Sequence, residues 1–174
     1  MKKIILILLL LSSFPLFSQK IEKDIIDEFT KNRIIHTSWV KFDKGYMAFR
    51  FKAIDNNTYL EYRYLSGNVI AIDKGAELLF IDSLNDRVYG LQSTDFIVAS
   101  RGGAATGFAG SDAYGIRADF KGNMLFFARL LKKMRIYTTD GYMERDIKPK
   151  EAKKIQQLYL LFQKTISGEC TNKK

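Results

Sequence analysis

The part of the chain best suited to chemistry is a glycine-rich segment from Gly102 to Gly115. Glycines let a backbone approach a ligand closely, and successive free N–H groups can form a concavity that binds anions. Arginines flank the segment on both sides and can add positive charge. The candidate ligand-binding residues are therefore Arg101, Gly102, Gly103, Gly107, Gly110, Ser111 and Arg117.

Two common nucleotide-binding patterns do not occur in this segment. A phosphate-binding loop needs Lys and then Ser or Thr after its second key glycine, and Phe108-Ala109 stand there instead. The dinucleotide pattern G-x-G-x-x-G is also missing. A close-packed crossing or bulge, where larger side chains would collide, is the simpler explanation of the glycines.

The chain has one histidine, His36, and one cysteine, Cys170. A zinc site of Cys and His ligands needs three or four such residues, so the sequence excludes it. A serine- or cysteine-based catalytic triad would have to use His36, although an ordinary strand histidine is the simpler interpretation. A lone cysteine also excludes a disulfide within the chain. We expect Cys170 to be an exposed thiol, with a disulfide between two molecules as the alternative.

Carboxylates and aromatic residues are plentiful, but their spacing assigns no chemistry to them. General acid–base catalysis by two carboxylates needs a defined separation in space, which the sequence does not supply. Asp55, Asn57 and Glu61 suggest calcium only superficially, because the glycine and twelve-residue spacing of a calcium loop are missing. Trp39 and the nine tyrosines could form a platform for a sugar or lipid, or fill and edge a core. We expect no metal ion and no other cofactor.

Residues 1–18 have the organisation of a signal peptide. Met1-Lys2-Lys3 is a short positive start, residues 4–11 form an apolar run, and residues 12–18 end it with serines and a proline. The run is well short of the roughly 20 residues that a membrane-spanning helix needs. No cysteine follows at which a lipid could be attached. We therefore expect export to the periplasm or cell surface, not as a lipoprotein, with an uncleaved membrane anchor as the alternative.

The chain is strongly basic, with 28 Lys and Arg against 19 Asp and Glu among 174 residues. Its net charge of +9 falls to +7 when Lys2 and Lys3 are removed. Such a balance favours contact with anionic surfaces. Because export argues against nucleic acid as the partner, the remaining anions are lipid head groups, polysaccharides and acidic proteins.

Residues 19–167 are expected to form one domain, followed by a disordered tail at 168–174. A chain of this length buries about two thirds of its surface. Strands joined mostly by short turns, with helices over the hydrophobic face, predict an α+β fold built on an antiparallel sheet. Residues 19–32 suit either a short helix or an extended arm.

The clearest element is a β-hairpin whose two strands alternate apolar and polar residues around Asn56-Asn57. Asn accepts the positive φ of a two-residue turn, so we place the turn there. This register sets Lys52 opposite Glu61, a favourable pair of opposite charges. It leaves one mismatch, since Arg50 then faces Arg63.

Two further hairpins and several single strands are expected along the chain. One hairpin turns at residues 84–86. The other turns at Asp140-Gly141, a strong turn signal, and sets Arg135 opposite Asp146. The remaining strands are expected at residues 34–42, 96–100 and 114–120.

Two helices are expected in the second half of the chain. Asn123 can cap a helix that runs to about Lys132. Pro149 can open a C-terminal helix that stops at Gly168, because a missing N–H costs nothing at the first helical position. Its buried stripe is predicted to be Ala152, Ile155, Tyr159, Phe162 and Ile166.

Five short segments carry a family resemblance: residues 26–30, 37–39, 58–61, 107–111 and 135–142, with the sequences IDEFT, TSW, TYLE, GFAGS and RIYTTDGY. Together they resemble a group of small exported proteins of uncharacterised function common in Bacteroidetes. The resemblance implies a periplasmic or cell-surface setting. It implies no catalytic or binding residue.

The sequence favours a non-catalytic exported module that binds an envelope component or a partner protein. The basic charge and the lack of a recognisable catalytic constellation motivate this expectation. One alternative is an envelope hydrolase with its site near Gly102–Gly115. Another is an electrostatic binder of anionic envelope lipid or glycan. Convergent polar groups in a pocket at the glycine segment would favour the hydrolase.

Overall fold

The structure, a computed structural model, describes residues 20–101 and 113–168. The predicted signal peptide at 1–18 and the tail beyond residue 168 lie outside the described residues. So do six single predictions, those for Gly102, Gly103, Gly107, Gly110, Ser111 and Cys170.

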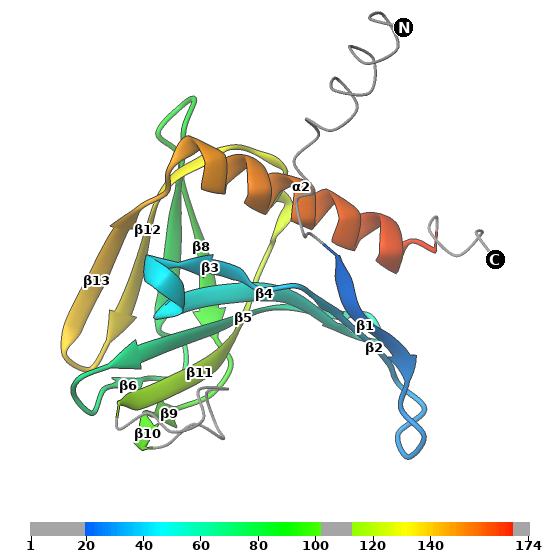
Figure 1. Cartoon of the computed structure of the whole chain (residues 1–174), viewed down its shortest axis with the longest axis horizontal. Helices are drawn as coiled ribbons and strands as arrows, with labels where there is room; N and C mark the ends of the chain where they lie inside the picture. Colours follow the sequence, from blue (N-terminus) through cyan, green and yellow to red (C-terminus); the bar gives the residue numbers. More distant parts are fainter. Residues whose placement is uncertain (1–19, 102–112, 169–174) are drawn as a thin grey trace, which may run out of the picture.

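One strongly curved antiparallel sheet dominates the fold (Figure 1). Its strands are β1 (Ile21–Ile26), β2 (Arg33–Thr37), β3 (Val40–Phe42), β4 (Met47–Ile54), β5 (Asn57–Ser66), β7 (Glu77–Asp82), β8 (Val88–Ser93), β10 (Ser100–Arg101), β11 (Tyr114–Lys121), β12 (Leu131–Thr138) and β13 (Gly141–Asp146). Their order is β1-β2-β4-β5-β11-β8-β7-β12-β13, with β3 paired to β4 and β10 to β11. A second, two-stranded sheet joins β6 (Ala71–Ile72) to β9 (Ile97–Val98). The predicted α+β class with a mainly antiparallel sheet is confirmed.

A single α-helix, α2 (Pro149–Ile166), lies across one face of the curved sheet within the described part of the chain (Figure 1). Pro149 occupies the first turn, as expected, and the Glu151 carboxylate accepts the Lys148 backbone N–H at 2.9 Å. The predicted stripe is buried except for Ile166, which is half-buried. No helix of the described residues is long and apolar enough to cross a membrane.

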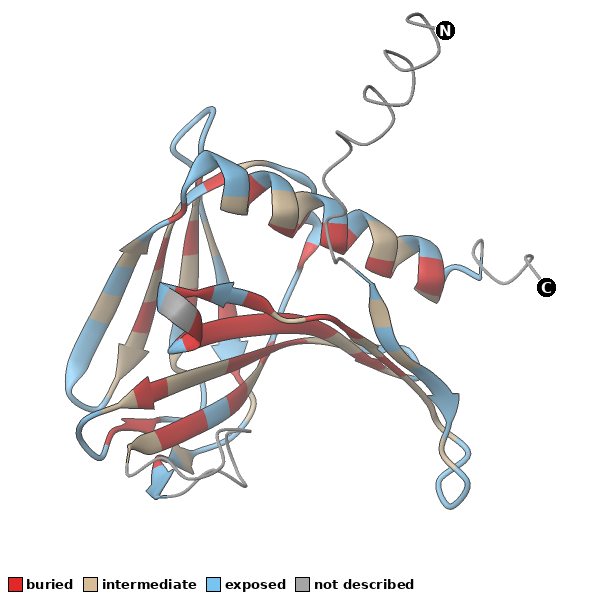
Figure 2. Cartoon of the chain, in the orientation of Figure 1, coloured by how far each residue is buried: buried red, intermediate tan, exposed pale blue. Residues whose placement is uncertain are grey.

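The core fills the space between the curved sheet and α2, and it is rich in aromatic rings. Figure 2 shows the buried residues gathered on β4 and on the side of α2 that faces the sheet. Phe51 of β4 lies at its centre, with ring centroids 5.0 Å from Phe127, 5.2 Å from Tyr159 and 5.6 Å from Phe162. These three partners come from parts of the chain far from β4, so the packing of rings holds sheet and helix together.

The predicted register of the first hairpin is wrong by two residues. Ile54 pairs with Asn57, so the turn consists of Asp55-Asn56. Asp55 adopts a φ of 49° and is fixed by strand β2, because Arg33 donates its N–H to the Asp55 side chain at 2.8 Å. Since the shift is an even number of residues, the apolar face stays buried, as predicted.

The last hairpin is displaced in the same way. Thr138 pairs with Gly141, so the turn is Thr139-Asp140 and Arg135 faces Glu144 instead of Asp146. The Thr139 hydroxyl accepts the N–H of Ala71 in β6 at 3.1 Å, and the Thr139 N–H donates to the Ala71 carbonyl at 2.9 Å. In both hairpins, hydrogen bonds to a distant strand decide which residues form the turn.

The helix expected from Asn123 to about Lys132 is wrong. The Asn123 side chain does accept the Leu125 N–H at 3.0 Å, but the chain forms only the 3-10 turn η2 (Leu125–Ala128) before β12 begins. Strand β12 lies between β7 and β13 and pairs with both. Pairing on two edges outweighs the helical spacing of the apolar residues.

The remaining predicted strands are present with changed limits. The segment left open at 19–32 forms β1, which pairs with β2 and extends with it away from the body of the protein (Figure 1). The strand expected at 34–42 is divided into β2 and β3 by Ser38-Trp39. The strand expected at 96–100 is divided into β9 and β10.

Candidate functional site

Two of the sequence-predicted site residues are described by the structure, and it does not bring them together. Arg101 lies in β10 opposite Tyr114 and above its ring, at 6.0 Å from the centroid. Arg117 lies three positions further along β11. Because side chains alternate along a strand, Arg101 and Arg117 project from opposite faces of the sheet.

Arg117 instead belongs to a polar surface on the face of β3, β4, β5 and β11 that points away from the core. Strand register arranges this outer face in rows. One row contains Arg50, Glu61 and Asp119, which are direct neighbours on β4, β5 and β11. The next row places Arg63 directly opposite Arg117.

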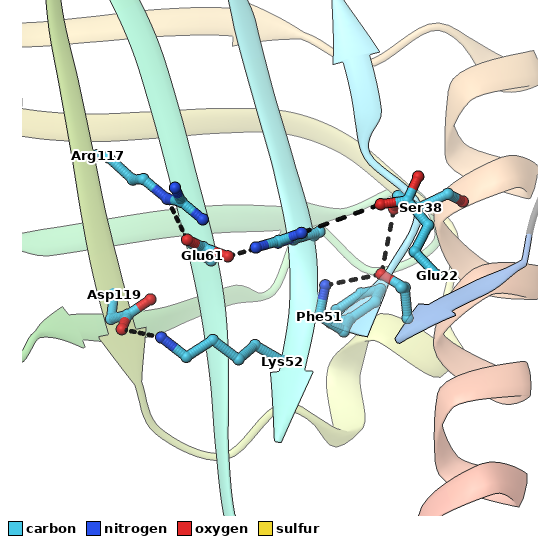
Figure 3. A network of polar contacts seen from close by, with 9 residues as sticks. Glu22, Ser38, Phe51, Lys52, Glu61, Arg117 and Asp119 are labelled. Atoms are coloured by element: carbon cyan, nitrogen blue, oxygen red, sulfur yellow. Dashed lines mark hydrogen bonds and ion pairs between the residues drawn. The ribbon is translucent and has the colours of Figure 1, made fainter. Parts of the chain in front are cut away.

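Glu61 lies at the centre of the outer face and is only 3% exposed (Figure 3). Arg50 donates its Nε–H to one carboxylate oxygen at 2.5 Å, and Arg117 donates its Nε–H to the other. Burial raises the pKa of Glu61, but the hydrogen bonds from Arg117 and Arg50 outweigh burial and hold the pKa below its usual value. Glu61 is therefore a buried carboxylate held ionised between two guanidinium groups.

Trp39 lies beside this ion pair and is surrounded by arginines. The guanidinium carbons of Arg63, Arg50 and Arg117 lie 4.2, 4.6 and 5.8 Å from the centroid of its ring. Each distance is within the range of a cation–π contact. The half-buried indole thus lies within cation–π distance of three guanidinium groups.

A local interruption between β2 and β3 places Trp39 on this surface. The Thr37 hydroxyl accepts the N–H of Phe51 at 3.0 Å and donates to the Ser38 carbonyl at 3.1 Å. At Phe51 neither β2 nor β3 pairs with β4, so the Thr37 hydroxyl takes the place of a backbone carbonyl as acceptor for the Phe51 N–H. The next two residues can then leave the strand path.

A second aromatic ring on the outer face repeats the arrangement around Trp39. The ammonium nitrogens of Lys52 and Lys121 lie 5.5 and 5.8 Å from the centroid of the Tyr59 ring. Lys52 also pairs with Asp119 at 2.5 Å (Figure 3). Tyr59 is half-buried, so it presents part of an ordered ring to solvent beside two lysines.

His36 stands at the edge of this surface, opposite Lys52 in the pairing of β2 with β4. Burial lowers its pKa to about 4, and the positive charge of Arg50 adds to the effect. The imidazole is therefore neutral at pH 7. Within residues 20–101 and 113–168, no three His, Cys, Asp or Glu side chains are grouped closely enough to hold a metal ion.

The outer face carries an excess of positive charge. Three carboxylates, those of Glu22, Glu61 and Asp119, form ion pairs with its basic side chains. We name as the basic patch the six cations Lys41, Arg50, Lys52, Arg63, Arg117 and Lys121 together with the rings of Trp39 and Tyr59. Six cations and three carboxylates give the basic patch an excess of three positive charges.

Of this patch, the sequence predicts only Arg117 as a site residue. An aromatic platform is one of two interpretations of Trp39, and the predicted register sets Arg50 opposite Arg63. The useful signal was the set of charged residues on the polar side of three strands. Only the correct register shows that these residues line up.

Comparisons of the chain with protein-family models, with curated proteins and with solved structures find no significant match.

Proposed function

We propose that the chain is an exported, non-catalytic binding module, and that its basic patch holds an anionic polysaccharide of the cell envelope. One observation carries the proposal. Two half-buried aromatic rings, Trp39 and Tyr59, each lie beside two or more cations on one continuous sheet face.

The chemistry of the basic patch suits an acidic sugar polymer. A flat aromatic face packs against the C–H face of a sugar ring, while guanidinium groups bind carboxylate or sulfate oxygens in pairs. The patch extends over four neighbouring strands, which suits an extended chain of residues better than one small molecule. The rings and cations are already held in place, so little ordering is needed on binding.

An anionic lipid surface is the less favoured source of negative charge. Attraction to lipid head groups requires positive charge but no ordered aromatic rings, and stable attachment to a bilayer needs apolar side chains that can insert. None of the large hydrophobic residues of the described chain that are strongly exposed belongs to the basic patch. The two features together favour a sugar polymer.

The test measures binding of the purified protein to polygalacturonate, to neutral dextran and to vesicles that contain phosphatidylglycerol. We expect binding to polygalacturonate that weakens as salt is added, and none to dextran. Changing two exposed patch lysines together, K41Q with K121Q, should lower the affinity at least about fivefold at low salt. The matched control is K150Q with K153Q, which removes the same charge from the exposed face of α2.

Several results would contradict the proposal. Equal losses in the two double variants would mean that net charge alone drives binding. Binding to the vesicles without binding to polygalacturonate would assign the patch to a lipid surface. A lack of response to either would leave an acidic protein as the partner.

A further inference from the structure

A pocket lies away from the basic patch, where two strands of the sheet separate. Strand β11 pairs with β8 only at its last residues, Phe120 with Ser93 and Lys121 with Gln92. The chain then leaves the sheet and forms η2 beside β8. The separation opens a pocket of about 450 Å³, within the range usual for small ligands. Its lining includes Arg87, Tyr89, Asn123, Leu125, Phe126 and Arg129.

One wall of the pocket is a pair of stacked aromatic rings. Phe126 of η2 lies parallel to Tyr89 of β8, with centroids 4.9 Å apart and planes at 10°. Phe126 is almost fully buried and contacts the ring of Phe80 in the core. Gln156 of α2 donates from its side chain to the Ala128 carbonyl at 2.6 Å, which fixes η2. The wall is therefore formed before any ligand arrives.

Two guanidinium groups line the same pocket. Arg129 points one nitrogen at the Asp82 carboxylate, 3.3 Å away, while half of its side chain stays exposed. Asp82 is fully buried and also accepts the Leu84 N–H at 2.7 Å. One carboxylate thus balances one arginine.

The second guanidinium supplies charge that is not balanced. Arg87 lies above the Tyr89 ring, 5.6 Å from its centroid. It forms no ion pair with any carboxylate of residues 20–101 and 113–168. The pocket consequently carries one net positive charge next to an aromatic wall.

One large apolar side chain, that of Leu125, lines the pocket although it is 67% exposed. Asn123 also lines the pocket. A bound ligand would cover this apolar surface, which otherwise faces water.

We propose that this pocket binds a small anion attached to a flat ring, such as an aromatic carboxylate or an aromatic phosphate ester. The anionic group lies between Arg87 and Arg129, which can each donate two hydrogen bonds to its oxygens. The ring packs against the exposed edge of Tyr89 and against the side chain of Leu125. The site shares no strand-pairing row with the basic patch, so the two proposals stand or fail separately.

The experiment titrates the full chain with phenyl phosphate and follows binding by calorimetry. Inorganic phosphate and benzyl alcohol serve as probes of the two halves of the ligand. We expect phenyl phosphate to bind at least about tenfold more tightly than either. R87Q should weaken it by about tenfold or more. R101Q is the matched control, because Arg101 also lies above a tyrosine ring, at 6.0 Å, on another strand.

A second variant keeps the test independent of any change at an arginine. L125E places a negative charge at the entrance, on a side chain exposed enough not to affect folding, and should also weaken binding of phenyl phosphate. The proposal is overturned if the unchanged protein does not bind phenyl phosphate at millimolar concentration. It is also overturned if R87Q and R101Q behave alike, or if inorganic phosphate binds as tightly as the ester.

Discussion

Replacing Glu61 by Gln tests whether the outer face is held by its central carboxylate. Gln has nearly the same shape but no charge, and an NH2 group replaces one of the two carboxylate oxygens. It can therefore keep only one of the two hydrogen bonds that Glu61 accepts from Arg50 and Arg117. The change would leave three guanidinium groups around Trp39 without the carboxylate at their centre.

The magnitude follows from how far each partner is buried. The side chains of Glu61 and Arg50 are 4% and 10% exposed, so water cannot replace the lost pair. Removing one partner of a buried ion pair costs about 3–5 kcal/mol. Arg117 is 41% exposed, so water replaces most of its share. We therefore expect about 3 kcal/mol, or a fall in Tm of about 6–12 °C for a domain of this size.

Thermal and urea unfolding measure the effect, with E144Q as the matched control. Glu144 also accepts two hydrogen bonds from one guanidinium, that of Arg135, but on an exposed hairpin. Its replacement should leave Tm close to that of the unchanged protein. If E61Q and E144Q shift Tm equally, burial of the ion pair is not what stabilises the outer face.

Two further predictions concern His36 and the aromatic core. The pKa of His36 is about 4 in the folded protein and 6.5 in the unfolded chain, so between these pH values the unfolded state binds a proton that the folded state does not. Acidification from pH 6.5 towards pH 4 should therefore lower the free energy of unfolding by about 1–2 kcal/mol, a loss that H36Q does not show. Urea unfolding of both proteins at pH 6.5 and at pH 4 measures the difference. A parallel fall in both proteins would contradict this. Phe51→Ala, at the centre of the ring cluster, should cost about 3–5 kcal/mol, whereas Phe29→Ala, at a position 94% exposed, should change stability by no more than about 0.5 kcal/mol. Comparable losses in urea unfolding would show that Phe51 does not organise the core.

The amino-acid pattern predicts most of the strands and the buried face of the first hairpin, because alternation depends on neighbouring residues alone. Register was not predictable in the same way. Whether Asp55 or Asn57 belongs to the turn depends on the hydrogen bond from Arg33, a residue on another strand. The same holds for Thr139, which is fixed by Ala71. Local turn preference cannot include a partner that only the folded chain supplies.

The candidate site was less predictable still, because its members lie far apart in the sequence. Nearness to a glycine segment predicts Arg117 as a site residue, yet its partner Glu61 is 56 residues away along the chain. Trp39 reaches the same surface through the interruption that Thr37 stabilises between β2 and β3. A charged residue on the polar side of a strand is ordinary by itself. Only sheet pairing gathers several of them around one ring.

The buried ion pair on the outer face is better explained by orientation than by stability. A pair of apolar residues at positions 50 and 61 would hold the sheet at least as well, because ions lose their hydration on burial. An apolar pair would not hold Arg117 and the Trp39 ring in fixed positions. The Glu61 carboxylate directs two guanidinium groups, and these with Arg63 fix the indole. Binding by side chains already fixed in this way loses less conformational entropy, which is what the proposed polysaccharide site requires.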